Sequence, residues 1–160
     1  MCVALVLGLG FFLTRFLHDP DINGRTGITV DAQGHPIVVA EICHGTVKRV
    51  RIYGPNPGAG KHDPVDADLS TAPQKTSFTL DPSSPGSAWD GQPLNLPVAD
   101  EMHSVILNTG NKSQLQEVTF TPQDLAALRP GTVQFDTYTR YEVGHSTVNI
   151  ADFHRLACGK

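Results

Sequence analysis

The chain has 160 residues, charged residues make up 18% of it, and its formal net charge is -4 at pH 7. This length suits one domain of ordinary size with a short additional segment. The charge argues against a nucleic-acid partner, because phosphate binding needs a concentrated basic surface. Fifteen Gly and twelve Pro, with few long helix-forming runs, predict a mainly β protein of short strands joined by turns.

The first 17 residues, MCVALVLGLGFFLTRFL, are apolar except for Thr14 and Arg15. A membrane crossing takes about 20 apolar residues, and this segment reaches that length only if Arg15 extends to the interface. No basic region precedes the apolar stretch and no small-x-small site follows it, which favours an uncleaved anchor over a cleaved signal peptide. We expect residues 1–17 to bind a membrane and residues 1–20 to form an apolar helix. A buried helix of a cytosolic protein is the alternative.

Part of a calcium-loop pattern follows this segment. Asp19, Asp21, Asn23 and Gly24 match the first half of D-x-[DN]-x-[DN]-G, in which alternate oxygen ligands wrap a hard cation. The twelfth position is Val30 instead of the bidentate Glu. The calcium candidate is therefore Asp19, Asp21 and Asn23, and a plain turn is the favoured interpretation, because Asp, Asn and Gly are common in turns.

Residues 36–43, PIVVAEIC, carry a strand pattern that is apolar on both faces, as in a strand inside a sandwich. His44 and Gly45 end this run. The short connection in residues 31–35 contains a Gly and predicts a hairpin between residues 28–30 and this strand.

Residues 46–53 predict a second strand with a cleaner alternation of apolar and polar side chains. A period of two places Val50 and Ile52 inward. The opposite face then holds Val47, Arg49, Arg51 and Tyr53. One face therefore packs, and the other meets water or a partner.

The remaining strand patterns are separated by a long segment rich in proline. Residues 54–100 hold eight of the twelve prolines and show strand character only at residues 76–80, so we expect a surface insertion in a β domain that spans residues 27–160. Its start, GPNPGAGKH, does not match the spacing of a phosphate-binding loop, and no nucleotide is expected. Further strands are predicted at residues 102–108, 115–121, 132–141 and 147–150.

One run of residues looks like part of a known family. Val118-Thr-Phe-Thr-Pro, followed by Leu128-Arg-Pro-Gly-Thr-Val-Gln-Phe, resembles the penultimate strand corner of immunoglobulin-like and fibronectin type III-like sandwiches. The likeness implies an antiparallel β-sandwich in which residues 46–53 lie beside residues 132–141. Asp136 and Arg140 would then share a face with the arginines of the second strand. The likeness implies no activity.

Of the three cysteines, Cys43 and Cys158 form the plausible pair. Their disulfide would close a loop of about 115 residues and stabilise the fold by up to roughly 4–5 kcal/mol in the chain-entropy model. Such a bond predicts an oxidising compartment. Two free thiols in a cytosolic protein are the alternative.

No pattern for catalysis is visible. The seven histidines show neither H-x-x-x-H nor H-x-x-E-H spacing, and no Gly-x-Ser-x-Gly elbow is present, so we expect neither enzyme activity nor a cofactor. Histidines from different strands that converge on a metal remain an alternative.

The function expected from the sequence is therefore binding. We expect a membrane-tethered, extracytoplasmic sandwich that acts in protein–protein interaction or as an accessory subunit of an envelope assembly. The predicted partner-binding residues are Arg49, Arg51 and Tyr53, since Arg and Tyr are enriched at interfaces. Charge pairing on a solvated face is the simpler interpretation of the same residues. A small metal-binding or enzymatic module on the same sandwich is the alternative function.

Overall fold

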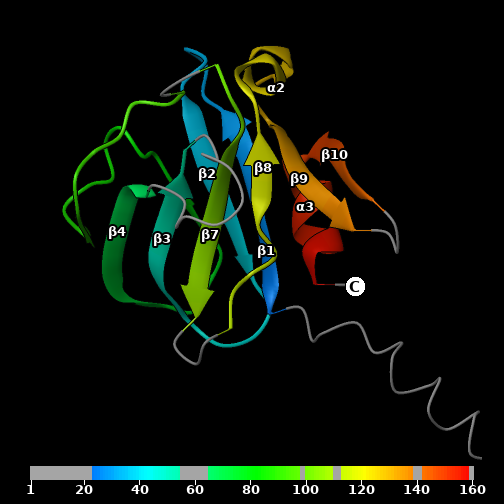
Figure 1. Ribbon diagram of the computed structural model, residues 1–160. Helices are drawn as coiled ribbons and strands as arrows, with labels where there is room; N and C mark the ends of the chain where they lie inside the picture. Colours follow the sequence, from blue (N-terminus) through cyan, green and yellow to red (C-terminus); the bar gives the residue numbers. More distant parts are fainter. Residues whose placement is uncertain (1–22, 55–64, 98–99, 110–112, 139–141, 159–160) are drawn as a thin grey trace, which may run out of the picture.

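The computed structural model describes residues 23–54, 65–97, 100–109, 113–138 and 142–158 (Figure 1). These residues form ten strands and two helices. The strands are β1 (Gly24–Val30), β2 (Pro36–Ile42), β3 (Val47–Tyr53), β4 (Val65–Gln74), β5 (Phe78–Leu80), β6 (Trp89–Asp90), β7 (His103–Thr109), β8 (Val118–Phe120), β9 (Thr132–Tyr138) and β10 (Val143–Asn149). The helices are α2 (Pro122–Ala127) and α3 (Ile150–Ala157).

The strands form two antiparallel sheets of five strands each, which confirms the predicted mainly β, sandwich-like architecture. The order in the first sheet is β10-β9-β1-β2-β5, and the order in the second is β6-β4-β3-β7-β8. Their facing sides meet in one core in which Ile28, Val38, Val50 and Leu107 are fully buried. Alternate positions of β1, β2, β3 and β7 supply this core, as the period of two requires.

The hairpin between β1 and β2 forms as predicted, with Ile28 opposite Val38. Its turn depends on Asp31, whose Oδ1 accepts the backbone N–H groups of Gln33 and His35 at 2.8 Å each. An Asp that bonds backbone groups a few residues ahead is a common way to stabilise a turn. The bond from the His35 N–H stabilises the ionised carboxylate and lowers the pKa of Asp31.

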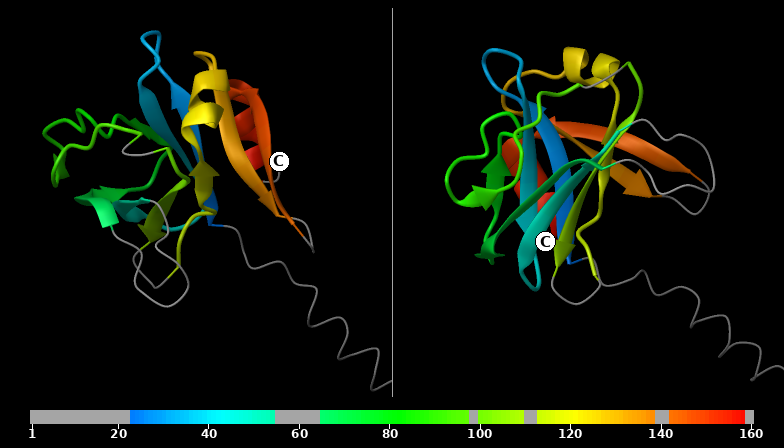
Figure 2. Two further views of the ribbon diagram at one scale, coloured as in Figure 1. Left: turned by 45° about the horizontal axis from the view of Figure 1, so that its top comes forward. Right: turned by 60° about the vertical axis from the view of Figure 1, so that its left-hand side comes forward.

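The outer face of the first sheet carries a second apolar core, which α3 covers. Figure 2 shows α3 against this sheet, on the side away from β3 and β4. This core consists of Val39, Val133, Phe135, Phe153 and Ala157. A close approach is possible because Gly27 lies beneath Phe153: a Cβ at residue 27 would come within 2.4 Å of a Val133 methyl carbon and 3.2 Å of the Phe153 ring.

The sequence analysis did not predict α3 and assigned Ile150 to a strand. The structure ends that strand at Asn149, whose side-chain oxygen accepts the backbone N–H of Asp152 at 2.8 Å and so caps the helix. Phe153 and Ala157 are four residues apart and therefore share one helical face. Val133 and Phe135 are buried as predicted, but they face α3 instead of the core between the sheets.

Cys43 and Cys158 form the predicted disulfide, with their Cα atoms 5.5 Å apart. Cys43 directly follows β2 and Cys158 directly follows α3. The bond therefore links the covering helix to the strand that it covers, across a sequence separation of 115 residues.

The proline-rich segment contributes more to the sandwich than the sequence predicted. Its ten-residue strand β4 pairs with β3, and only β5 corresponds to the expected strand at residues 76–80. The Trp89 ring lies 5.5 Å from that of Phe78, and both pack against the core. The described part of this segment thus belongs to the fold itself.

The expected placement of β9 beside β3 is wrong. β3 pairs with β4 and β7, whereas β9 pairs with β1 and β10 in the opposite sheet. The apolar residues of β9 pack against α3, so β9 belongs to the sheet whose outer face that helix covers.

The predicted apolar helix at residues 1–20, together with Asp19 and Asp21, lies outside the described residues. Asn23 is described, and its carbonyl accepts the N–H groups of Cys43 and His44. Within the described part of the chain, no helix is both long enough and apolar enough to cross a membrane.

Replacing Cys43 and Cys158 together with Ser should lower the free energy of unfolding by up to about 4–5 kcal/mol, because the unfolded chain loses its cross-link. Urea denaturation, followed by the fluorescence of Trp89, measures this loss. Cys2→Ser is the control and should leave the midpoint unchanged. Alkylation of both Cys43 and Cys158 in the native, unreduced protein would contradict the disulfide.

Candidate functional site

The outward face of β3 carries three cationic side chains close together: Lys48, Arg49 and Arg51. A regular strand would place two neighbours such as Lys48 and Arg49 on opposite faces. Here the two-residue step from Val47 to Arg49 pairs with the one-residue step from Thr109 to Asn108 on β7, which marks a β-bulge in β3. Bulges redirect side chains, and this one leaves both Lys48 and Arg49 exposed.

Because of this bulge, Val47 lies on the opposite face of β3 from the one predicted. The alternation of the sequence placed Val47 outward with the arginines, but its side chain is fully buried in the core between the sheets. The extra residue in β3 changes the alternation at this point, so Val47 faces the same way as Val50.

The arginines of β3 share one carboxylate, that of Asp68 on β4. Arg49 Nε lies 2.9 Å from Asp68 Oδ1, and Arg51 Nε lies 3.4 Å from Asp68 Oδ2. The sequence analysis instead placed Asp136 and Arg140 on the same face as these arginines. Asp136 lies in the other sheet, and Arg140 lies outside the described residues.

Tyr53 completes the predicted set, because it forms a hydrogen bond with Arg51. This bond stabilises the charged guanidinium and raises the pKa of Arg51. The structure thus brings Arg49, Arg51 and Tyr53 together at one side of β3.

A shallow, open hollow of ≈ 460 Å³ lies over β4, β3 and β7, the three neighbouring strands shown in Figure 1. The residues that line it all have polar or charged side chains: Lys48, Arg49, Arg51, Ser70, Thr71, Asn108 and Thr109. This set combines charged donors with hydroxyl and amide groups. It can therefore bind an anionic group and hydrogen-bond to its neighbours.

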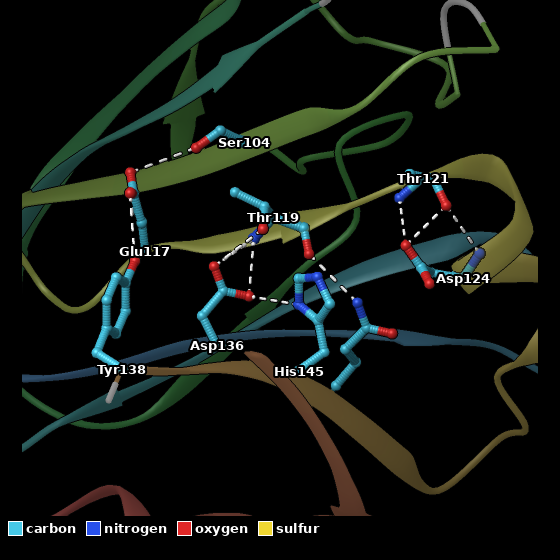
Figure 3. Close-up of polar contacts among 9 residues, drawn as sticks. Ser104, Glu117, Thr119, Thr121, Asp124, Asp136, Tyr138 and His145 are labelled. Carbon is cyan, nitrogen blue, oxygen red and sulfur yellow. Dashed lines mark hydrogen bonds and ion pairs between the residues drawn. The ribbon is translucent and has the colours of Figure 1, made fainter. Parts of the chain in front are cut away.

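A second polar group, which the sequence analysis missed, joins β8 to β9 (Figure 3). Its centre is Asp136, which is only 1% exposed although it was predicted to face outward. The Asp136 carboxylate accepts the backbone N–H of Thr119 at 3.1 Å and the Thr119 hydroxyl at 3.0 Å. His145 Nδ1 lies 3.0 Å from the other oxygen. We call this group, together with the contacts described next, the β8–β9 seam.

Three further contacts extend the β8–β9 seam along both strands. The Gln134 side chain donates to the Thr119 carbonyl at 3.2 Å. Near the other end, the Tyr138 hydroxyl donates to Glu117 at 3.3 Å, and Ser104 donates to the same carboxylate at 3.4 Å. Partial burial, followed by the charge of Glu117, raises the pKa of Tyr138. Side chains thus connect the two sheets at this side, where the backbones of β8 and β9 are not paired.

The Asp136–His145 pair has the geometry of a base held by an orienting carboxylate. Among the described residues, no Ser, Thr or Cys side chain is bonded to His145 in the position of a nucleophile. The contacts of Asp136 are those of a structural anchor, because its oxygens bind β8 and β10 at once.

Two other histidines contact carboxylates, each in a different part of the fold. His35 contacts Asp31 at 3.0 Å in the β1–β2 turn, and His154 of α3 contacts Glu41 of β2 at 2.5 Å. Within the described part of the chain, no group of three or more His, Cys, Asp or Glu side chains is arranged to hold a metal ion.

Comparisons with known proteins give no relative for this chain. No protein-family model matches it, and neither curated proteins nor solved structures show a match. Any function has to be argued from its own residues.

Asp136→Ala should lower the free energy of unfolding by about 2–3 kcal/mol, because the Thr119 amide and hydroxyl lose their buried acceptor. Chemical denaturation measures this change. Glu117→Gln is the control: its partners are more exposed, so we expect a loss of no more than about 1 kcal/mol. Equal losses in the two variants would show that Asp136 does not anchor the seam.

Proposed function

We propose that this protein is a non-enzymatic, membrane-tethered β-sandwich that binds a protein partner through the outer face of β3. The single observation that carries the proposal is the concentration of Lys48, Arg49 and Arg51 on one side of a bulged strand. With Tyr53 beside Arg51, the face has the residue types that anchor interfaces.

Charge pairing alone explains only part of this face. Both arginines do pair with Asp68, as the simpler interpretation requires, and exposed pairs of this kind contribute about 0–1 kcal/mol each to stability. The three cations outnumber the described carboxylates of this face, Asp68 and Asp90, the latter opposite Ser70, on a chain whose formal net charge is -4. A local excess of positive charge on a negatively charged protein can attract an acidic partner. It therefore favours partner binding over charge pairing within the chain alone.

The proposed location is the extracytoplasmic side of a membrane, with residues 1–17 as the tether. The Cys43–Cys158 disulfide supports this location, because disulfides persist in oxidising compartments. A small tethered binding domain suits an accessory subunit of an envelope assembly.

We also propose a relationship to immunoglobulin-like sandwiches. The neighbours β1-β2-β5 in one sheet and β4-β3-β7-β8 in the other follow the order A-B-E and C′-C-F-G of that fold, which supports this relationship. The strands β9 and β10 are additional, since they extend the first sheet beyond β1. The Leu128-Arg129-Pro130-Gly131 corner leads into β9, which is not the strand expected from the family likeness.

Replacing Arg49, Arg51 and Tyr53 together with Ser should abolish partner capture by cross-linking in the native membrane. The melting temperature should fall by only a few degrees, because about 1 kcal/mol corresponds to roughly 2–4 °C in a chain of this size. The matched control is Arg129→Ser with Arg155→Ser, which removes two exposed arginines elsewhere, one of them paired with Asp152. If the triple variant still captures the partner, residues 54–100 become the better candidate for the interface.

Deleting residues 1–20 should release the protein from the membrane fraction and leave a soluble chain that melts cooperatively. The reason is that the described residues from β1 onward supply two apolar cores of their own. Fractionation and thermal denaturation of the two chains measure this. An insoluble, unfolded deletion variant would mean that the N-terminal segment is part of the core.

A further inference from the structure

We infer that the hollow over β4, β3 and β7 is the subsite for an acidic segment of the partner, with an Asp or Glu carboxylate bound among Lys48, Arg49 and Arg51. This inference rests on the proposed function and names the chemistry of the partner. It is carried by the lining of the hollow, by its charge and by its shape.

The positive charge of the hollow follows from the bulge. Without it, Lys48 would face the opposite side from Arg49 and Arg51. Both guanidiniums contact Asp68 through Nε, and Arg51 also bonds Tyr53, so the remaining terminal N–H groups can meet a second carboxylate. Arg forms paired hydrogen bonds to planar carboxylates with defined geometry, so an acidic side chain suits this arrangement.

The polar residues around the hollow suit a peptide. Ser70, Thr71 and Thr109 offer hydroxyl groups beside the cations. A peptide brings backbone N–H and C=O groups together with its carboxylates, so it can bond to the hydroxyl groups and to the cations at once.

The shape of the hollow also favours an extended segment. It is open and spans three neighbouring strands, from Ser70 and Thr71 on β4 to Asn108 and Thr109 on β7. An acidic segment that crosses β3 can place one side chain over the cations and neighbouring backbone over the hydroxyl groups. The Thr71 and Thr109 hydroxyls already donate to Ala88 and Ser113, and their remaining lone pairs can accept from such a backbone.

The test is fluorescence anisotropy of the full chain with a short labelled peptide of alternating Glu and Gly. A peptide of alternating Gln and Gly serves as the uncharged control. We expect the Glu peptide to bind and the Gln peptide to bind at least about tenfold more weakly, with an affinity that falls as salt shortens the Debye length. Equal binding of the two peptides would overturn the inference.

Substitutions in the hollow test whether the Glu peptide binds there. Arg49→Gln with Arg51→Gln should weaken binding of the Glu peptide by about tenfold or more, while the exposed-site control Arg129→Gln with Arg155→Gln leaves it unchanged. Asn108→Ala removes a polar side chain from the lining of the hollow and should also weaken binding of the Glu peptide. If the control variant loses as much affinity as the hollow variant, the effect is general charge and the subsite is wrong.

Competition experiments distinguish an acidic peptide from other anionic ligands. Inorganic phosphate and heparin, a sulfated polysaccharide, are added against the labelled Glu peptide at matched charge concentration. We expect unlabelled Glu peptide to compete better than either one. Equal or better competition by heparin would replace the acidic peptide with a polysaccharide and overturn the inference.

The two proposals fail in different ways. If Arg49→Gln with Arg51→Gln loses the native partner while the Glu peptide never binds, the partner face stands and the acidic-segment inference falls. If the Glu peptide binds in the hollow while native capture survives these substitutions, the hollow binds acidic peptides but the proposed partner face is wrong.

Discussion

Strand β2 is apolar on both of its faces, and the layers of the molecule follow from the need to cover both. Val38 and Ala40 turn toward the second sheet, and Val39 turns toward α3. Burying a Val side chain contributes roughly 1.5–3 kcal/mol, so neither face is left in water without a substantial loss. The sandwich covers one face. The helix, held by the disulfide and by the close approach over Gly27, covers the other.

Local patterns predicted the elements whose signals lie within a few residues. The β1–β2 hairpin, the apolar alternation of β7 and the pairing of the two cysteines follow from turn chemistry, period and position. The helix α3 had a local signal that was overlooked: Asn149 as a cap and Asp152 in the first turn, with Phe153 and Ala157 on one face. Missing that helix reversed the predicted faces of β9, so buried Asp136 was assigned to the surface.

The candidate site shows which residues the sequence pattern of a single strand can predict and which depend on strand pairing. Arg49, Arg51 and Tyr53 were placed together correctly, because a period of two holds over those residues. Lys48 was not included, because the bulge in β3 depends on its pairing with the distant strand β7. Asp68 and Asn108 lie 17 or more residues from Arg51 in the sequence and meet the cations only through strand pairing, which no local pattern encodes.

The sequence separation between β2 and α3 also sets an order of events during synthesis. The outer face of β2 is complete once residue 42 has been made, but its cover includes Ala157, 115 residues later. At about 5–20 residues per second, roughly 6–23 s separate the two. Through that interval Val39 has no native cover, and Cys43 has no native partner. Until α3 has been made, the emerging hairpin therefore exposes an apolar face and an unpaired thiol together.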